Sequence, residues 1–424
     1  MRVARIILAQ PLYANSLWLL LAQGFNYLLG FIFWLVVARL YPPPDVGLAI
    51  AILPAANMVA SFGMLGLGSS LIRFISDSGQ GASGLINQVS TAVFLMIALL
   101  AAIFILGIEI WSPALSFIQT EPTYLAIFLA LVLFSAWQAI LIAVFVAFRR
   151  SGYSLAVGLI HGAGKTIGVL VTASLVGGVG IILSWAVALA LSVALALFVF
   201  LPRILPHYRP KPRIDLRMLG SIVPFSFANH FAESFWSVPG WILPLVIVNR
   251  LGAEQNAYFG ITWVIAMLPF IIPRAIGMAM FAEGSHDTAQ MKTNLIGSLR
   301  LCALMLAPVV LAVMLIGDKL LLLYGEGYAA SGKTLLSITA LAVLPGTVVI
   351  LYVTLARVQK WLLQIIFLSA AEAIGIISLT LLLVGELGVL APGVAILTVN
   401  CLFAVVLLPR LFRVIQGKLE GNPL

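Results

Sequence analysis

Charged side chains are scarce in this chain, and their scarcity excludes the class of soluble globular proteins. Asp, Glu, Lys and Arg make up 9% of the 424 residues, and hydrophobic residues make up 62%. Soluble domains carry roughly a quarter charged and about half apolar residues. Apolar runs long enough to cross a bilayer, about 20 residues each, recur from one end of the sequence to the other. The composition therefore predicts a polytopic α-helical membrane protein.

Cysteine and histidine are also scarce, with two and four residues. Cys302 and Cys401 both fall inside apolar runs, which argues against a disulfide framework or a thiolate metal site. The histidines are scattered, and the sequence has no H-E-x-x-H motif, no G-x-S-x-G motif and no paired carboxylates at catalytic spacing. We therefore expect no catalytic constellation, no metal and no cofactor, and classify the chain as a non-enzyme.

Hydropathy predicts an all-α fold of about twelve transmembrane helices. The first apolar run is too long for a cleaved signal peptide and is expected to be retained. Only Gly177 and Gly178 separate the fifth and sixth spans, so the count depends most on this short turn. The expected spans are 14–40, 45–72, 84–108, 123–148, 153–177, 179–202, 218–249, 256–281, 293–317, 334–356, 362–384 and 388–409.

Basic residues predict the orientation of these spans. Most of the 23 Lys and Arg residues fall in segments that share one side of the membrane, and that side also holds both chain ends. The positive-inside rule makes this side cytoplasmic. We therefore expect a multi-pass protein of the cytoplasmic membrane with both termini in the cytoplasm. The net charge of +9 is then explained by orientation and by attraction to membrane lipids, without nucleic acid.

A basic, proline-rich stretch, PRILPHYRPKPRIDLR from Pro202 to Arg217, is the longest interruption between spans. It predicts two pseudo-symmetric six-helix lobes, 1–206 and 218–424, joined by a stiff cytoplasmic linker at 207–217. The lobes share a faint repeat, because Arg39 and Arg250 each end a span before a short turn. Two six-span repeats around a site at the membrane midplane are typical of secondary transporters.

Ionisable residues inside the spans are the main candidates for function, because burying them in hydrocarbon is costly. Two pairs fall at i, i+4 and i, i+3 spacing, so that each pair shares one helix face. The alternative for Lys165 and Glu233 is a buried structural ion pair between the lobes, and the alternative for the two arginines is snorkelling to the cytoplasmic surface. The candidate substrate-binding residues are His161, Lys165, His230, Glu233, Glu372, Arg274, Arg300 and the amide Asn26. The amides Gln23, Gln138 and Asn400 are weaker candidates, each more often a helix–helix hydrogen bond.

Residues Gly327 to Thr334 read GYAASGKT, a full match to the phosphate-binding pattern G-x-x-x-x-G-K-[ST]. A functional P-loop needs a parallel sheet and an acidic Mg²⁺ partner on a second strand. No soluble segment here is long enough for such a unit, and the predicted topology places Lys333 outside, where ATP is scarce. We therefore expect no nucleotide at Gly327–Thr334, and interpret the segment as an outer turn with a solvated lysine.

Three segments resemble the oligosaccharide flippases of the multidrug/oligosaccharidyl-lipid/polysaccharide exporter superfamily. LLLLYGEGYAASGKTLLSITALAVLP resembles the segment that joins their spans nine and ten. NYLLGFIFWLVVARLYPPPDVGLAI, followed by FGMLGLGSSLIRFI, resembles their first two spans, and AYFGITWVIAMLPFIIPRAIGMAMFAEGS resembles their eighth. The resemblance implies the same twelve-span, two-lobe plan with a cationic central cavity that opens alternately to each side.

The same resemblance implies a flippase that moves a polyprenyl-pyrophosphate glycan to the outer leaflet during cell-surface polysaccharide biosynthesis. Relatives that flip the peptidoglycan precursor use arginines in spans one, two and eight. Here only span eight has one, Arg274, while span one has Gln23 and Asn26 and the interior cation is Lys165. This departure favours another glycan. Glycosyltransferases or a polymerase of the pathway are the expected partners.

Two other functions compete with the flippase. A cation-coupled multidrug exporter of the same superfamily would need carboxylates to dominate the cavity, whereas Lys165 and two arginines match the interior Glu233 and Glu372. A membrane-embedded glycosyltransferase or polymerase would need a large outer loop, and every outer segment is short. We expect Lys165 and Arg274 to bind the pyrophosphate. The glutamates and histidines would contact sugar or couple transport to H⁺ or Na⁺.

Overall fold

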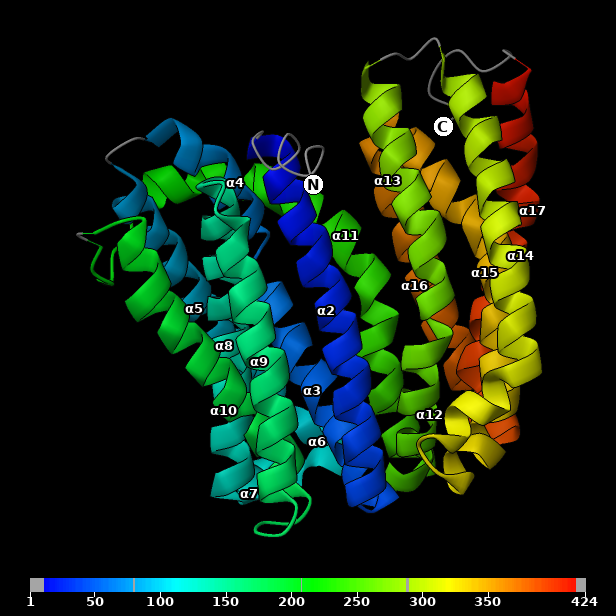
Figure 1. The fold of residues 1–424 in the computed structure, drawn as a ribbon, viewed down its shortest axis with the longest axis horizontal. Coiled ribbons are helices and arrows are strands. Elements are labelled where there is room, and N and C mark those ends of the chain that lie inside the picture. The colour runs from blue at the N-terminus through cyan, green and yellow to red at the C-terminus, as the bar shows by residue number, and fades with distance from the viewer. Residues whose placement is uncertain (1–10, 79–80, 207, 287–289, 417–424) are drawn as a thin grey trace, which may run out of the picture. The chain divides into compact units, whose positions relative to one another are not determined.

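The computed structural model describes the chain apart from residues 1–10, 79–80, 207, 287–289 and 417–424 (Figure 1). Within the helices, it leaves the side chains of 11–17, 20, 76–78, 216–219, 221–233, 285–286 and 415 undescribed. The described residues form helices and turns without a strand, and ten helical stretches are long and apolar enough to cross a membrane. The expected all-α membrane fold is confirmed.

The chain divides into two compact units, Met1–Ser234 and Phe235–Leu424. This division lies inside one helix, α11 (Leu216–Leu251), and therefore beyond the linker at which the sequence places the boundary between lobes. The pseudo-symmetric repeat of the two lobes stays a prediction.

Among its described residues, the first unit contains seven long helices before α11. It also contains the short helices α6 (Ile108–Trp111) and α7 (Phe117–Thr120), 3-10 turns at Pro113–Leu115 and Leu201–Arg203, and a π-helical turn at Ala196–Phe200. Its long helices are α2 (Pro11–Leu40), α3 (Pro43–Gly63), α4 (Leu67–Ser78), α5 (Ala82–Leu106), α8 (Pro122–Ala147), α9 (Ser151–Thr172) and α10 (Val179–Leu195). Figure 1 shows α9 beside α2 and α10, and these are the most extensive helix pairings of the unit.

The predicted second span, 45–72, is broken in the structure. It ends as α3 at Gly63 and resumes as α4 at Leu67, because Leu65 and Gly66 take positive φ angles of 48° and 72°. Only glycine adopts this left-handed conformation without a steric penalty. The fifth and sixth spans are separate helices, as expected, and Gly177 makes the turn between them with φ of 59°.

In its described residues, the second unit contains the second half of α11 and six further helices. A 3-10 turn at Leu268–Phe270, which contains Pro269, divides the predicted eighth span into α12 and α13. The helices are α12 (Ala253–Ala266), α13 (Ile271–His286), α14 (Met291–Leu322), α15 (Glu326–Val358), α16 (Leu362–Leu387) and α17 (Ala391–Ile415).

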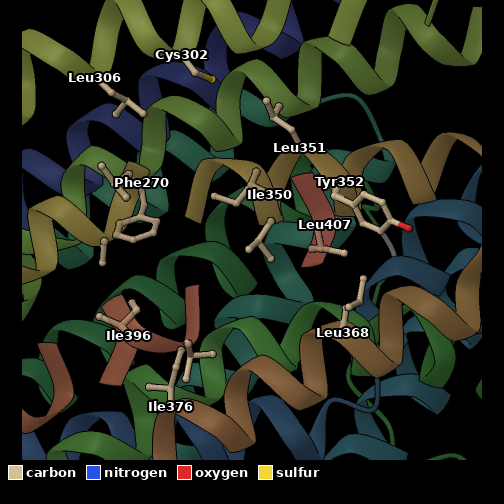
Figure 2. Packing of buried hydrophobic residues seen from close by; sticks show 14 of the residues in the cluster. Phe270, Cys302, Leu306, Ile350, Leu351, Tyr352, Leu368, Ile376, Ile396 and Leu407 are labelled. Carbon is tan, nitrogen blue, oxygen red and sulfur yellow. The ribbon is translucent and has the colours of Figure 1, made fainter. Parts of the chain in front are cut away.

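Helix α15 is the centre of the second unit, because it packs against α12, α13, α14 and α17. Its residues Ile350, Leu351 and Tyr352 lie in the buried hydrophobic cluster of Figure 2, together with Cys302 of α14. Cys302 is buried as a small hydrophobe, as expected, whereas Cys401 is exposed on α17. Large aliphatic side chains remain exposed along α14 and α16. Such extended apolar surface suits contact with lipid rather than water.

The basic linker is fixed to α5 by its backbone. The Asn87 side chain donates from Nδ2 to the Arg209 carbonyl at 3.0 Å and accepts the Lys211 N–H at 3.3 Å. The Thr91 hydroxyl accepts the Arg213 N–H at 3.0 Å. Burial raises the pKa of the neighbouring Tyr208 phenol to about 12. Residues 209–213 of the linker are therefore docked on α5, while the side chains of Arg209, Lys211 and Arg213 stay exposed.

Asn87→Ala is expected to release this linker. Loss of two hydrogen bonds worth about 1 kcal/mol each raises the open population by roughly 30-fold. Trypsin cleavage after Arg213, followed in inside-out vesicles, should accelerate accordingly, because cleavage of a transiently open segment follows its open population. Asn249→Ala is the control, since that amide belongs to the second unit and donates to the Leu245 carbonyl of its own helix. An unchanged cleavage rate in Asn87→Ala would contradict docking, and cleavage only in right-side-out vesicles would contradict the predicted orientation.

Candidate functional site

Lys165 lies in an aromatic cage in the first unit. Its ammonium Nζ is 3.6 Å from the ring centroid of Trp185 and 4.9 Å from that of Phe33. The Phe33 and Trp185 rings meet edge to face, with their centroids 5.0 Å apart, and Trp34 packs against Phe33 at 5.2 Å. Only 4% of Lys165 is exposed. We call Phe33, Trp34, His161, Lys165 and Trp185 the Lys165 cage.

His161 completes this cage from the same face of α9. Its ring centroid is 5.6 Å from that of Trp185, so the predicted i, i+4 pairing of His161 with Lys165 is confirmed as a shared contact with one indole. The His161 Nε2 is buried and has no hydrogen-bond partner among the described residues. The cage therefore holds one cation and one unsatisfied ring nitrogen.

Small residues of α9 make this close approach to the neighbouring helices possible. A side chain at Gly162 would collide with Leu29 of α2, and one at Gly168 would lie 2.9 Å from Ser184 Cβ of α10. Helices in membranes approach most closely where small residues face one another. The Lys165 side chain is consequently held between the aromatic residues of α2 and α10.

Among the residues that the structure describes, no acidic side chain forms an ion pair with Lys165. A cation–π contact contributes about 2 kcal/mol or more when it is desolvated, which offsets only part of the cost of burying an ammonium ion. The suggested partner, Glu233, belongs to the part of α11 whose side chains lie outside the described residues, as does His230. The ion-pair alternative for Lys165 and Glu233 therefore stays a hypothesis.

A second cluster lies wholly within the second unit. Arg274 of α13 places its guanidinium carbon 4.4 Å from the ring centroid of Trp236 on α11. The same arginine interacts electrostatically with Glu372 of α16, a carboxyl group buried inside the unit. The sequence singled out Arg274 and Glu372 separately, and the structure brings them together. Each unit thus has one candidate cation in contact with the ring of a tryptophan.

The other sequence candidates whose side chains the structure describes differ in their surroundings. Arg300 is exposed on α14 and Asn26 is exposed on α2. Gln138 donates to the Ser192 hydroxyl at 2.9 Å, so it forms the helix–helix hydrogen bond that was its alternative interpretation. Asn400 is buried opposite Gly346 of α15, and its Oδ1 has no partner among the described residues. Within that described part of the chain, no group of three His, Cys, Asp or Glu side chains is placed to hold a metal ion.

The P-loop-like segment is helical rather than a turn, which corrects our interpretation. Gly327–Thr334 forms the first turns of α15, and the chain reverses before it, at Gly325, whose φ is 142°. A phosphate cradle needs backbone N–H groups that converge from a loop, so this helix lacks the required geometry. Lys333 is exposed, as expected, and its Nζ lies 3.5 Å from Asp318 Oδ2.

Gly332→Val is expected to destabilise the protein, whereas Lys333→Ala is expected to have little effect. A side chain at Gly332 would collide with Thr262 of α12 and press on Leu321 of α14, and overpacking typically costs about 1–3 kcal/mol. The Lys333–Asp318 pair is exposed to solvent, where an ion pair contributes little to stability. The melting temperature of each purified variant measures this difference. A Lys333→Ala variant that lost transport at normal stability would reopen the nucleotide hypothesis.

Comparison with known proteins relates this chain to one protein family and to several solved structures. A family model described as "Polysaccharide biosynthesis protein" matches residues 12–282. The structure of the lipid II flippase MurJ in an inward closed conformation aligns with a TM-score of 0.74 at 14% sequence identity, covering 96% of this chain and 94% of that one. No curated protein matches the chain significantly.

Multidrug transporters share the same fold. An inward-facing MATE family transporter of the MOP superfamily aligns with a TM-score of 0.70 at 14% identity, covering 93% of this chain and 95% of that one. An outward-facing MATE structure gives 0.60 at 15% identity, with 98% of each chain covered. Identities this low establish the fold alone. The family match covers more than half of the chain and carries the finer assignment.

Proposed function

Because the chain belongs to the family of polysaccharide biosynthesis proteins, we propose that it moves a lipid-linked oligosaccharide across the cytoplasmic membrane by alternating access. The match over residues 12–282 is the observation that carries this function. The fold shared with a lipid II flippase supports it, since that fold accommodates transport of a lipid-linked headgroup. The chain is a multi-pass membrane protein whose substrate and surroundings are both lipids. We further propose that both termini are cytoplasmic.

The two tryptophan-bound cations supply the chemistry that a pyrophosphate needs. The faces of Trp185 and Trp236 contact Lys165 and Arg274. A pyrophosphate oxygen offers each cation a charge-assisted hydrogen bond, which is stronger than a cation–π contact in a medium of low dielectric constant. We propose that, when substrate binds, each cation leaves its indole ring and binds the pyrophosphate instead. The indoles would then keep the empty transporter from exposing bare charge to the bilayer.

Polar groups near each cation add to the proposed substrate contacts of each unit. The unpaired His161 Nε2 and the buried Glu372 carboxyl are suited to bind a sugar hydroxyl or to carry a proton. Arg300 and Asn26, exposed on their helices, would contact the glycan or the lipid headgroups. We propose that His230 and Glu233 also bind the substrate. Coupling to H⁺ or Na⁺ and docking of glycosyltransferases or a polymerase belong to the same proposal, and no enzymatic step or cofactor is part of it.

The shared fold of the multidrug transporters makes a drug exporter the second candidate. Deleting the gene separates the two functions in cells. A flippase deletion should accumulate lipid-linked glycan on the cytoplasmic side and lose surface polysaccharide, with drug susceptibility unchanged. Increased drug susceptibility with normal surface polysaccharide would overturn the flippase assignment and favour the exporter.

A further inference from the structure

A groove of about 270 Å³ lies between α16 and α17, and its lining includes no residue of either cation cluster. Leucine and valine side chains and the rings of Phe367 and Phe403 form most of its wall. Its only long polar side chains are Gln364 and Arg410. The groove is therefore an apolar slot with a small number of polar groups, as lipid-binding and ligand-binding sites commonly are.

The polar groups gather at one end of this slot. Gln364 lies in the first turn of α16, and Arg410 lies near the end of α17, which packs against α16. The basic residues of the sequence predict that this end is cytoplasmic. From Leu402 to Arg410 the groove runs about 12 Å along α17, which approaches the half-thickness of a bilayer's hydrocarbon core, about 15 Å. Its length therefore suits a lipid chain of one leaflet.

Among the described residues, the carbonyl oxygen of Gln364 has no hydrogen-bond donor and the charge of Arg410 has no acidic partner. Gln364 is 2% exposed, and its Nε2 donates to the Tyr352 hydroxyl at 2.8 Å, but its Oε1 accepts no hydrogen bond from the described residues. Arg410 forms no ion pair with any acidic side chain that the structure describes. A buried carbonyl without a donor is rare, because each such group loses its hydration. The end of the groove thus offers a cation to an anion and an acceptor to a hydroxyl.

We propose that this groove binds one anionic phospholipid of the cytoplasmic leaflet whose headgroup carries hydroxyls, as phosphatidylglycerol does. Arg410 holds the phosphate, a headgroup hydroxyl donates to Gln364 Oε1, and an acyl chain lies along Phe367 and Phe403. Basic pockets between transmembrane helices at the cytoplasmic side are suited to anionic headgroups. A phosphatidylethanolamine headgroup would place its ammonium group beside Arg410 and fit less well.

A second groove provides an internal contrast. It lies between α13 and α14, encloses about 490 Å³ and is also largely apolar, but the charged residue in its lining is Glu283. A carboxylate repels a phosphate, because both are negatively charged. An anionic lipid should therefore select the α16–α17 groove and not the α13–α14 groove. Charge, rather than apolar surface alone, distinguishes the two.

Photolabelling of the intact protein tests this assignment. Purified full-length chain is reconstituted in vesicles of equal phosphatidylglycerol and phosphatidylethanolamine, with a trace of either lipid bearing a diazirine in its acyl chain. Labelled peptides are then mapped by mass spectrometry. The phosphatidylglycerol probe should label peptides that contain Phe367 and Phe403 in preference to the phosphatidylethanolamine probe. Arg410→Gln should lower this labelling about fivefold.

Two further variants keep the test decisive. Arg413→Gln removes an exposed charge from the same end of α17 outside the groove, and labelling should stay within about twofold. Val406→Trp fills the groove from a position that is 57% exposed, so it should lower labelling even if Arg410→Gln folds poorly. Equal loss in Arg413→Gln and Arg410→Gln, equal labelling by the two lipids, or displacement by equimolar polyprenyl pyrophosphate would overturn the proposal.

Discussion

Lys165→Met is expected to abolish transport of the lipid-linked glycan without destabilising the protein. The ammonium group is 3.6 Å from the Trp185 centroid, is almost fully buried and has no acidic partner among the described residues. Methionine fills a similar volume and removes the cost of burying a charge, so the melting temperature should stay level or rise. Loss of a desolvated contact to pyrophosphate typically costs about 2–5 kcal/mol. The transport rate should therefore fall roughly 100-fold or more.

The measurement pairs an initial transport rate in vesicles with a melting curve of the purified protein. Lys333→Met is the matched control, because Lys333 is exposed and pairs only with Asp318, and both quantities should stay unchanged. A Lys165→Met variant that transports normally would remove this residue from the substrate site. A variant that melts far below the wild type would show a structural role instead.

Trp185→Ala is expected to produce the largest loss of stability among single substitutions in the Lys165 cage. Truncating a tryptophan in a packed region typically costs about 3–5 kcal/mol, and here it also removes the ring beneath the Lys165 ammonium. In a Lys165→Met background the same truncation should cost about 2 kcal/mol less, because no buried cation then needs the indole face. A double-mutant cycle on the unfolding free energy measures this difference.

Trp137 provides the control for that cycle. Its ring packs edge to face against Phe94, with the centroids 5.2 Å apart, and neither ring contacts Lys165. Trp137→Ala should destabilise the protein by an amount that is the same with Lys165 or Met at position 165. If Trp185→Ala likewise cost the same with Lys165 as with methionine at that position, the cation–π contact would contribute nothing to the stability of the folded state.

The sequence was sufficient to predict the class of fold. It also identified the titratable residues of each cluster, but not the aromatic residues that they contact. Apolar runs predicted where the long helices lie, since the length and hydropathy of a span are local properties. The spacing of His161 and Lys165 placed them on one face, which the structure confirms. Phe33, Trp34 and Trp185 were missed, because their approach depends on how α2 and α10 rotate about their axes. The glycines of α9 were the available signal, since they indicate where neighbouring helices come closest.

Breaks within helices were the least predictable feature of the chain. The break at Leu65 and Gly66 lies in an unbroken apolar run, so hydropathy does not reveal it. In Gly327–Thr334, glycine and alanine suit both a turn and a closely packed helix. The deciding element is the packing of Gly332 against Thr262 of α12, a contact between residues far apart in sequence. Arg274 and Glu372 were likewise known as candidates but could not be paired until α13 and α16 were placed in one unit.

Translocation by the purified chain alone tests the flippase function most directly. Vesicles containing the protein and a fluorescently labelled, pyrophosphate-linked oligosaccharide lipid are treated with a membrane-impermeant quencher. Lipid on the inner leaflet should become quenchable over time in vesicles with the wild-type chain, and far more slowly with Lys165→Met. Quenching at the rate of protein-free vesicles, from protein that still transports a cationic drug, would contradict the flippase function and identify an exporter.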